Sequence, residues 1–353
     1  MSNTLDSDLT LETNGEEIFG HPKGLYVLFF TEMWERFSYY GMRAILTLYL
    51  VESTTSANPG LGWSTGESLA LYGWYTMMVY VMSIPGGIIA DKLLGQKKSV
   101  MVGGLLLCFG HGILAVEQMW AFYTGICLIV LGVGMLKPNI STMVGGLYTQ
   151  GDIRRDKGFT IFYIGINVGA FLSSIIVGYV GEVHGWHYGF GLAGIGMALG
   201  LAQYVIGQKH LTHVGNFLGE SNNAEEKAKM KAPLTTIEKD RVIVLMLSFV
   251  LVILFWGAFE QAGGLMNIYT KFNTDRVLMG WEIPATWFQS LNAFFIVVLG
   301  TTVAGFWAKR KLKGKASSSL YKMILGLIIM GTGFFFMTGA VAQFNANGSS
   351  AMY

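Results

Sequence analysis

Several side chains that can exchange protons or bind anions lie inside one strongly apolar stretch near the start of the chain. The stretch runs from about residue 24 to 51 and contains Glu32, Glu35, Arg36, Tyr39, Tyr40 and Arg43. At about 100° per residue, these positions fall on one helical stripe roughly 140° wide and roughly 16 Å long. A stripe of this kind is suited to line a polar cavity.

The composition favours a membrane setting for this stripe. The chain is 52% hydrophobic and only 13% charged, against about 25% charged in soluble proteins. An ionisable group at mid-bilayer depth costs roughly 2.5 to 3.5 kcal/mol, so charges there are expected to face a water-filled or protein-lined interior. The basic residues lie in short loops, so the net charge of +2 gives no indication of a nucleic-acid partner.

Nine apolar runs are long enough to cross a bilayer. They cover about residues 24–51, 68–91, 98–117, 120–147, 159–182, 187–207, 241–270, 284–308 and 320–343. We therefore expect an all-α polytopic membrane protein. Lysine and arginine concentrate in the connections after the second, fourth, sixth and eighth runs, which predicts a cytoplasmic amino terminus. Residues 1–22 contain five acids and neither Lys nor Arg, so they are interpreted as a tail rather than a signal peptide.

The charges expected within the membrane balance one another. They are Glu32, Glu35, Glu260, Arg36, Arg43 and Lys137. Structural ion pairing between helices is the simpler explanation, because an unpaired buried ion is several kcal/mol worse than a paired one. The stripe on the first helix favours a functional role in addition.

Two parts of the chain resemble each other at a shift of about 220 residues. Residues 30–35 (FTEMWE) resemble 255–260 (FWGAFE), and residues 90–95 resemble 308–314. Weak repeats of this kind are typical of transporters built from two bundles with a site between them. The expected parts are a cytoplasmic tail (1–22), a six-helix bundle (23–207), a polar linker (208–240), three helices of a second bundle (241–343) and a second tail (344–353).

The motifs together resemble a known family. The run Glu32-x-x-Glu35-Arg36-Phe37-x-Tyr39-Tyr40-Gly41 resembles the first signature of the proton-coupled oligopeptide transporters, the POT branch of the major facilitator superfamily. Residues 86–98 resemble the loop motif of that superfamily, and residues 159–171 resemble the second POT signature. Residues 255–261 and 284–292 are similar to later stretches of the family. The resemblance implies the major facilitator fold and proton-coupled symport of di- and tripeptides across a bacterial inner membrane.

The resemblance also implies roles for individual residues. Proton coupling would involve Glu32, Glu35, Arg36, Lys137 and Glu260, with Lys137 facing Glu260 across the bundles. Peptide binding would involve Arg43, Tyr39, Tyr40, Tyr80, Lys137, Tyr163, Asn167, Trp287 and Asn292. Asp91 and Lys92 would form a conformational latch. The proton would be the coupling ion, and no cofactor or metal is expected.

Elementary chemistry supports the central assignments. The Arg43 guanidinium can bind both oxygens of a peptide carboxylate, which an ammonium cannot do. No histidine lies between residues 22 and 110, and we interpret His111 as structural, so proton handling is assigned to the glutamates.

A carrier of nitrate, amino acids or drugs remains an alternative function, as does a receptor or scaffold without turnover. The chain contains no HExxH motif, phosphate loop or paired nucleophilic serine, so an enzyme is not expected.

The family resemblance implies twelve core helices. We therefore expect residues 1–353 to be part of a twelve-helix transporter, and to insert with the topology above but not to accumulate peptide by themselves.

Overall fold

The computed structural model describes residues 16–149, 151–216, 235–315 and 318–350. Parts of the predicted tails and linker, residues 1–15, 217–234 and 351–353, lie outside the described residues. In the first part of the chain the α-helices are α1 (Lys23–Val51), α2 (Thr65–Val81), α3 (Ser83–Ile89), α4 (Gln96–Leu114), α5 (Met119–Gly146), α6 (Arg155–Tyr179) and α7 (Trp186–Gly207). The later helices are α9 (Thr236–Phe259), α10 (Leu265–Asn273), α11 (Ser290–Leu312) and α12 (Ser319–Asn347).

Among the described residues, eight segments are long and apolar enough to cross a membrane. α1 is a ninth candidate, which carries the charges of the stripe within its 29 residues. The fold is therefore all-α in its membrane-spanning part, as the apolar runs predict.

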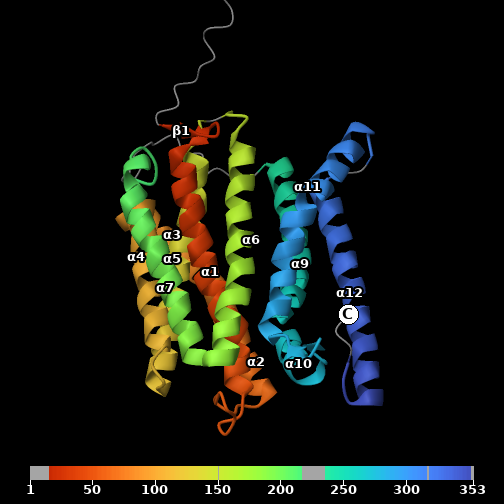
Figure 1. Ribbon diagram of the computed structural model, residues 1–353. Coiled ribbons are helices and arrows are strands. Elements are labelled where there is room, and N and C mark those ends of the chain that lie inside the picture. The colour runs from red at the N-terminus through yellow and green to blue at the C-terminus, as the bar shows by residue number, and fades with distance from the viewer. Residues whose placement is uncertain (1–15, 150, 217–234, 316–317, 351–353) are drawn as a thin grey trace, which may run out of the picture. The chain divides into compact units, whose positions relative to one another are not determined.

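The chain divides into two compact units, which are described separately. The first unit contains the described residues up to Ile45 and from Ala70 onward to residue 216, and the second contains Leu46–Leu69 and the described residues from 235. In the first unit, α4 packs against α5 and α7, and α3 packs against α5 (Figure 1). In the second unit, α9 packs against α12, and α10 packs against the 3₁₀ turn η5 (Ala285–Gln289). The domain boundaries expected from the sequence stay a prediction.

The end of α1 belongs to the second unit because its polar groups bond there. The Thr47 hydroxyl donates a hydrogen bond of 2.8 Å to the Gly263 carbonyl. The Asn267 amide donates one of 3.1 Å to the same hydroxyl. These bonds satisfy buried polar groups that would otherwise cost about 1 to 3 kcal/mol each.

Glycines allow α1 to pack closely within the first unit. A Cβ atom at Gly196 or Gly200 of α7 would lie only 2.5 Å from Phe37 Cδ1 or Trp34 Cβ respectively, and a Cβ at Gly207 would lie 2.5 Å from Val27 Cγ1. Small residues at helix contacts in membranes let backbones approach, and dispersion contacts then hold the helices together. The repeated glycines of α7 therefore form a smooth face against α1.

Three expected helices are interrupted, each where the sequence weakens the helical bonding. The expected helix 68–91 is divided into α2, α3 and a π-helical turn, η1 (Ala90–Leu94), with Pro85 lacking the amide hydrogen needed near the break. The expected helix 241–270 ends at Phe259, passes through the 3₁₀ turn η4 (Glu260–Ala262) and resumes as α10 after the Gly263–Gly264 pair. The expected helix 284–308 begins as the 3₁₀ turn η5 after Pro284.

Short elements that the hydropathy pattern did not predict complete the fold. The turn η2 (Val180–His184) extends α6, and η3 (Gln208–His210) follows α7. Strands β1 (Glu17–Ile18) and β2 (His21–Pro22) pair antiparallel, as do β3 (Val277–Leu278) and β4 (Trp281–Glu282). The connections Phe19–Gly20 and Met279–Gly280 have positive φ at both residues, which suits a two-residue hairpin loop.

Candidate functional site

The charged stripe of α1 is buried inside the first unit. The exposed fractions are 3% for Glu32, 0% for Glu35, 3% for Arg36 and 4% for Arg43. Tyr39 of the same stripe is 3% exposed. The stripe is therefore a protein-lined polar interior, as its helical spacing predicts, rather than a surface of solvated charges.

Arg36 lies between the two carboxylates. Its Nε atom is 2.9 Å from Glu32 Oε1 and 2.5 Å from Glu35 Oε2. Charge attraction acts in both contacts, and a hydrogen bond from Arg36 to Glu35 adds to it. Glu32 Oε2 and Glu35 Oε1 are buried without a hydrogen-bond partner among the described residues. The carboxylates thus retain acceptor capacity for a proton or a donor group.

Aromatic rings flank both arginines. The Arg36 guanidinium carbon lies 5.4 Å from the centre of the Tyr39 ring, and that of Arg43 lies 4.8 Å from the centre of the Tyr40 ring. Tyr75 of α2 stacks on Tyr39 with ring centres 6.2 Å apart. Such contacts attract a cation to the ring face and limit its movement. Tyr75 was not predicted, because a single tyrosine on an apolar helix is indistinguishable from ordinary packing.

Lys137 joins this cluster from α5. Its Nζ atom lies 4.1 Å from the centre of the Tyr80 ring of α2, and its charge acts on Glu35. Pro138 follows Lys137 inside the helix and removes one backbone hydrogen bond there. In their ionised forms the two carboxylates and the three cations Arg36, Arg43 and Lys137 leave one positive charge in excess. Such a site favours an anionic ligand.

The second signature contributes close packing beside Arg36. Asn167 of α6 is 5% exposed, and its amide donates a hydrogen bond of 2.8 Å to the Tyr163 carbonyl. The Tyr163 side chain is 50% exposed. A Cβ atom at Gly169 would overlap the Met33 carbonyl oxygen and would lie 3.1 Å from Arg36 Cβ. Gly169 thus lets α6 pass directly against the part of α1 that carries Arg36.

The remaining predicted residues lie elsewhere. Glu260 occupies the turn between α9 and α10, Trp287 lies in η5 and Asn292 in α11, all in the second unit. The Trp287 ring centre is 5.3 Å from that of Trp281. Lys137 belongs to the first unit and Glu260 to the second, and their expected pairing stays a prediction. Asp91 and Lys92 lie in η1 with exposed side chains, and their latch role also stays a prediction.

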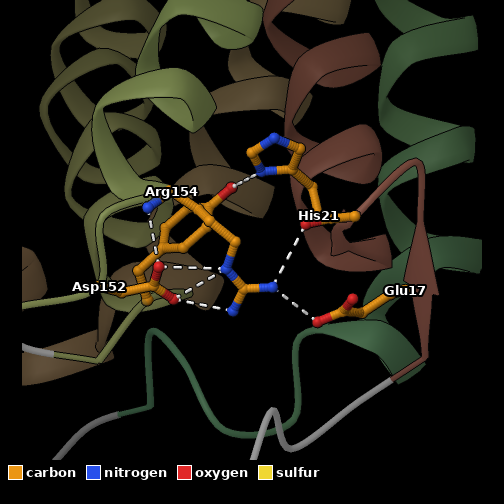
Figure 2. Close-up of polar contacts among 6 residues, drawn as sticks. Glu17, His21, Asp152 and Arg154 are labelled. Atoms are coloured by element: carbon orange, nitrogen blue, oxygen red, sulfur yellow. Dashed lines mark hydrogen bonds and ion pairs between the residues drawn. The ribbon is translucent and has the colours of Figure 1, made fainter. Parts of the chain in front are cut away.

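A second polar cluster joins the β1–β2 hairpin to the α5–α6 connection, and Figure 2 shows its bonds. Arg154 Nη2 donates to Asp152 Oδ2 at 2.8 Å, while its Nη1 donates to Glu17 Oε1 at 2.9 Å. His21 Nδ1 lies 2.8 Å from the Tyr148 hydroxyl. We call Glu17, His21, Tyr148, Asp152 and Arg154 the hairpin clasp. The sequence predicted Arg154 only as a loop charge, although the Asp-x-Arg spacing could have indicated the pairing.

Burial and charge shift the titration of the clasp. Burial lowers the pKa of His21, and the charges of Arg154 and Lys157 lower it further, against the opposing effect of Asp152 and Glu17. Hydrogen bonds from Arg154 lower the pKa of Asp152. Burial raises the pKa of Tyr148 to about 12. At neutral pH the clasp therefore contains a neutral histidine, an anionic Asp152 and a cationic Arg154.

Known proteins resemble this chain along most of its length. Residues 97–230 and 218–351 match the family described as "POT family". The chain is 34% identical to a di-/tripeptide transporter of Lactococcus lactis subsp. cremoris, with 93% of this chain and 77% of that protein covered. It is 31% identical to the peptide transporter YePEPT of Yersinia enterocolitica, with 96% and 77% covered.

A solved structure shares the fold. A POT family transporter in complex with a thioalcohol-conjugated peptide superposes with a TM-score of 0.84 at 30% identity, with 95% of this chain and 79% of that chain covered. The eight candidate spans found among the described residues, together with these similarities, establish an integral membrane protein with the architecture that the motifs predicted.

Proposed function

This chain belongs to the POT family, and from that premise we propose that it transports di- and tripeptides together with protons into the cytoplasm by alternating access. The observation that carries the proposal is the buried cluster on α1, in which Arg36 lies between Glu32 and Glu35 beside Arg43. We place the protein in the bacterial inner membrane with its amino terminus in the cytoplasm. Its coupling ion is the proton, without a cofactor, and it is not an enzyme.

The excess positive charge of the cluster suits the carboxylate of a peptide. Arg43 is the proposed clamp, because its guanidinium can donate two parallel hydrogen bonds to the two carboxylate oxygens. The Tyr40 ring, 4.8 Å from the guanidinium carbon, holds the cation without using its donors. Lys137 adds a second positive charge near the same end of the peptide. Tyr80, Tyr163, Asn167, Trp287 and Asn292 are proposed to contact the backbone and side chains of the peptide.

Protonation of Glu35 is the proposed coupling event. With both carboxylates ionised, Arg36 is attracted to two anions at 2.9 and 2.5 Å. When Glu35 takes up a proton, Arg36 retains only Glu32 as an anionic partner, and Lys137 loses an attracting charge. The charge balance of the cluster then shifts by one unit toward positive. A peptide carboxylate restores that balance, which links proton loading to peptide loading.

Uptake into proteoliposomes tests the proposal. The protein used in the transport and dipeptide-binding tests is the twelve-helix form expected from the sequence. A labelled dipeptide should accumulate inside when the outer solution is more acidic, and an ionophore that collapses the proton gradient should abolish accumulation. Unlabelled tripeptide should compete, whereas nitrate and single amino acids should not. Accumulation that is independent of the gradient, or competition by nitrate alone, would contradict the proposal. Residues 1–353 reconstituted alone test the separate expectation that they do not accumulate peptide.

A further inference from the structure

A basic cavity lies where the start of α1 meets the segment after α7. It has a volume of about 360 Å³, and its lining includes Glu16, Lys23, Gly24, Lys209, His210 and His213. Ligand cavities in proteins commonly begin at about 300 Å³. The lining contains two lysines and two histidines against a single carboxylate, so its chemistry is that of an anion site.

The basic residues of the lining act electrostatically on the Glu16 carboxylate. The hydrogen bond and charge of Lys23 lower the pKa of Glu16, and the charges of His210 and Lys209 add to this effect. Glu16 is paired with Lys23, and one carboxylate can neutralise only one cation. Lys209 and the protonated forms of the histidines therefore leave positive charge over the cavity.

The walls of the cavity are fixed by packing and hydrogen bonds. A Cβ atom at Gly24 would lie 2.7 Å from Leu147 Cδ2 and 2.9 Å from the His210 carbonyl oxygen, so α1 directly contacts the segment after α7. Lys97 donates hydrogen bonds to the Thr212 carbonyl at 3.3 Å and to Asn216 Oδ1 at 2.9 Å. The backbone that carries the basic side chains is therefore fixed by these contacts.

We propose that this cavity binds a phosphate group at the membrane surface. On the side predicted to be cytoplasmic, basic pockets beside membrane helices meet the anionic headgroups of phospholipids. A phosphate group is recognised in the same way whether it belongs to a phosphatidylglycerol headgroup or to inorganic phosphate, because lysine binds it as a point charge. The site is separate from the α1 cluster and does not depend on the peptide transport proposed above.

Calorimetric titration of the purified 353-residue chain in nonionic detergent tests the site without peptide. The probes are a short-chain phosphatidylglycerol below its micelle concentration, inorganic phosphate, and a short-chain phosphatidylcholine as the zwitterionic comparison. The pocket variant is Lys209→Gln with His213→Gln. The control is Lys98→Gln with His184→Gln, which removes the same side-chain types outside the lining.

Saturable binding of phosphatidylglycerol should weaken about tenfold in the pocket variant, since charge-assisted bonds to phosphate are lost. It should change by less than about twofold in the control. If inorganic phosphate also binds, and its binding weakens in the pocket variant but not in the control, the cavity recognises the phosphate group alone. If only phosphatidylglycerol binds, the cavity recognises the lipid headgroup. Equal affinity in the pocket and control variants, or no binding of either anionic probe, would overturn the proposal. If the double variant does not fold, the comparison of Lys209→Gln with Lys98→Gln decides in the same way.

Discussion

The ammonium group of Lys137 on α5 lies 4.1 Å from the centre of the Tyr80 ring on α2. The contact fixes a cation of the proposed peptide site to a helix other than its own. Lys137 also acts electrostatically on Glu35 of α1, so α1, α2 and α5 meet at one charge cluster. The ring face attracts the ammonium group and limits its movement at this position.

Two substitutions of Tyr80 should therefore distinguish the contribution of its ring to dipeptide binding from that of its hydroxyl. Tyr80→Phe keeps the ring face, so dipeptide affinity should change little. Tyr80→Leu removes it, and affinity should fall about twofold to thirtyfold, because a cation–π contact contributes roughly 0.5 to 2 kcal/mol. Competition binding with a labelled dipeptide measures both variants. Equal affinities for the Phe and Leu variants would show that the ring does not position Lys137 for binding.

Arg43→Lys should weaken dipeptide binding about tenfold or more. The substitution keeps the charge but loses the planar fork that binds both carboxylate oxygens, and a charge-assisted hydrogen bond contributes roughly 1.5 to 3 kcal/mol. Arg155→Lys, at an exposed position near the start of α6, is the matched control and should bind as the unchanged protein does. An Arg43→Lys variant with unchanged affinity would remove Arg43 from the peptide site.

Gly169→Ala should disturb both stability and the site. The added methyl group would overlap the Met33 carbonyl oxygen and press on Arg36 Cβ, and overpacking of this kind costs about 1 to 3 kcal/mol. Gly87→Ala is the control, because nothing lies within 4 Å of its added Cβ, and alanine stabilises a helix relative to glycine by up to about 1 kcal/mol. The temperature of thermal unfolding in detergent and the affinity for dipeptide should both fall for Gly169→Ala and should not fall for Gly87→Ala. A variant as stable and as active as the control would contradict the assigned packing.

The hairpin clasp should loosen in acid. The pKa of His21 is lowered in the folded protein, so the unfolded hairpin binds a proton more readily, and the clasp is most stable above the ordinary histidine pKa of about 6.5. Its stability should fall as the pH drops below that value, and fall further as Asp152, whose pKa is also lowered, takes up a proton.

Hydrogen exchange of the amides from Glu17 to Gly20 measures this opening. After correction for the intrinsic rate, exchange should be faster at pH 5.5 than at pH 7.5. In His21→Gln, which has no titrating ring, the difference should shrink. Protection that is the same at both pH values in the unchanged protein would show that His21 does not control the hairpin.

The sequence was most informative where a pattern is local. The stripe of α1 could be predicted because charges in an apolar helix are rare, and helical spacing alone places Glu32, Glu35, Arg36 and Arg43 on one face. The breaks at Pro85 and Gly263–Gly264 were missed, since a hydropathy average does not register the loss of one or two backbone bonds.

The contacts between distant segments could not be predicted in the same way. The hairpin clasp joins His21 to Tyr148, 127 residues apart, through side chains that are ordinary loop residues when each is considered alone. Gly158 makes room for the Tyr148 hydroxyl, and no local rule links that glycine to a histidine before α1. The roles of Asp91, Lys92 and Glu260 stay predictions, because they concern movements or pairs of units rather than local geometry.

The most direct test of proton coupling at the α1 cluster is a comparison of exchange and accumulation by Glu35→Gln in proteoliposomes. Glutamine imitates the protonated carboxyl group, so the variant should still exchange labelled for unlabelled dipeptide across the membrane at equal pH on both sides. It should no longer concentrate dipeptide when an inward proton gradient is imposed, although the unchanged protein does both. Exchange without accumulation is the result we predict; accumulation by Glu35→Gln at the level of the unchanged protein would contradict the assignment of coupling to Glu35.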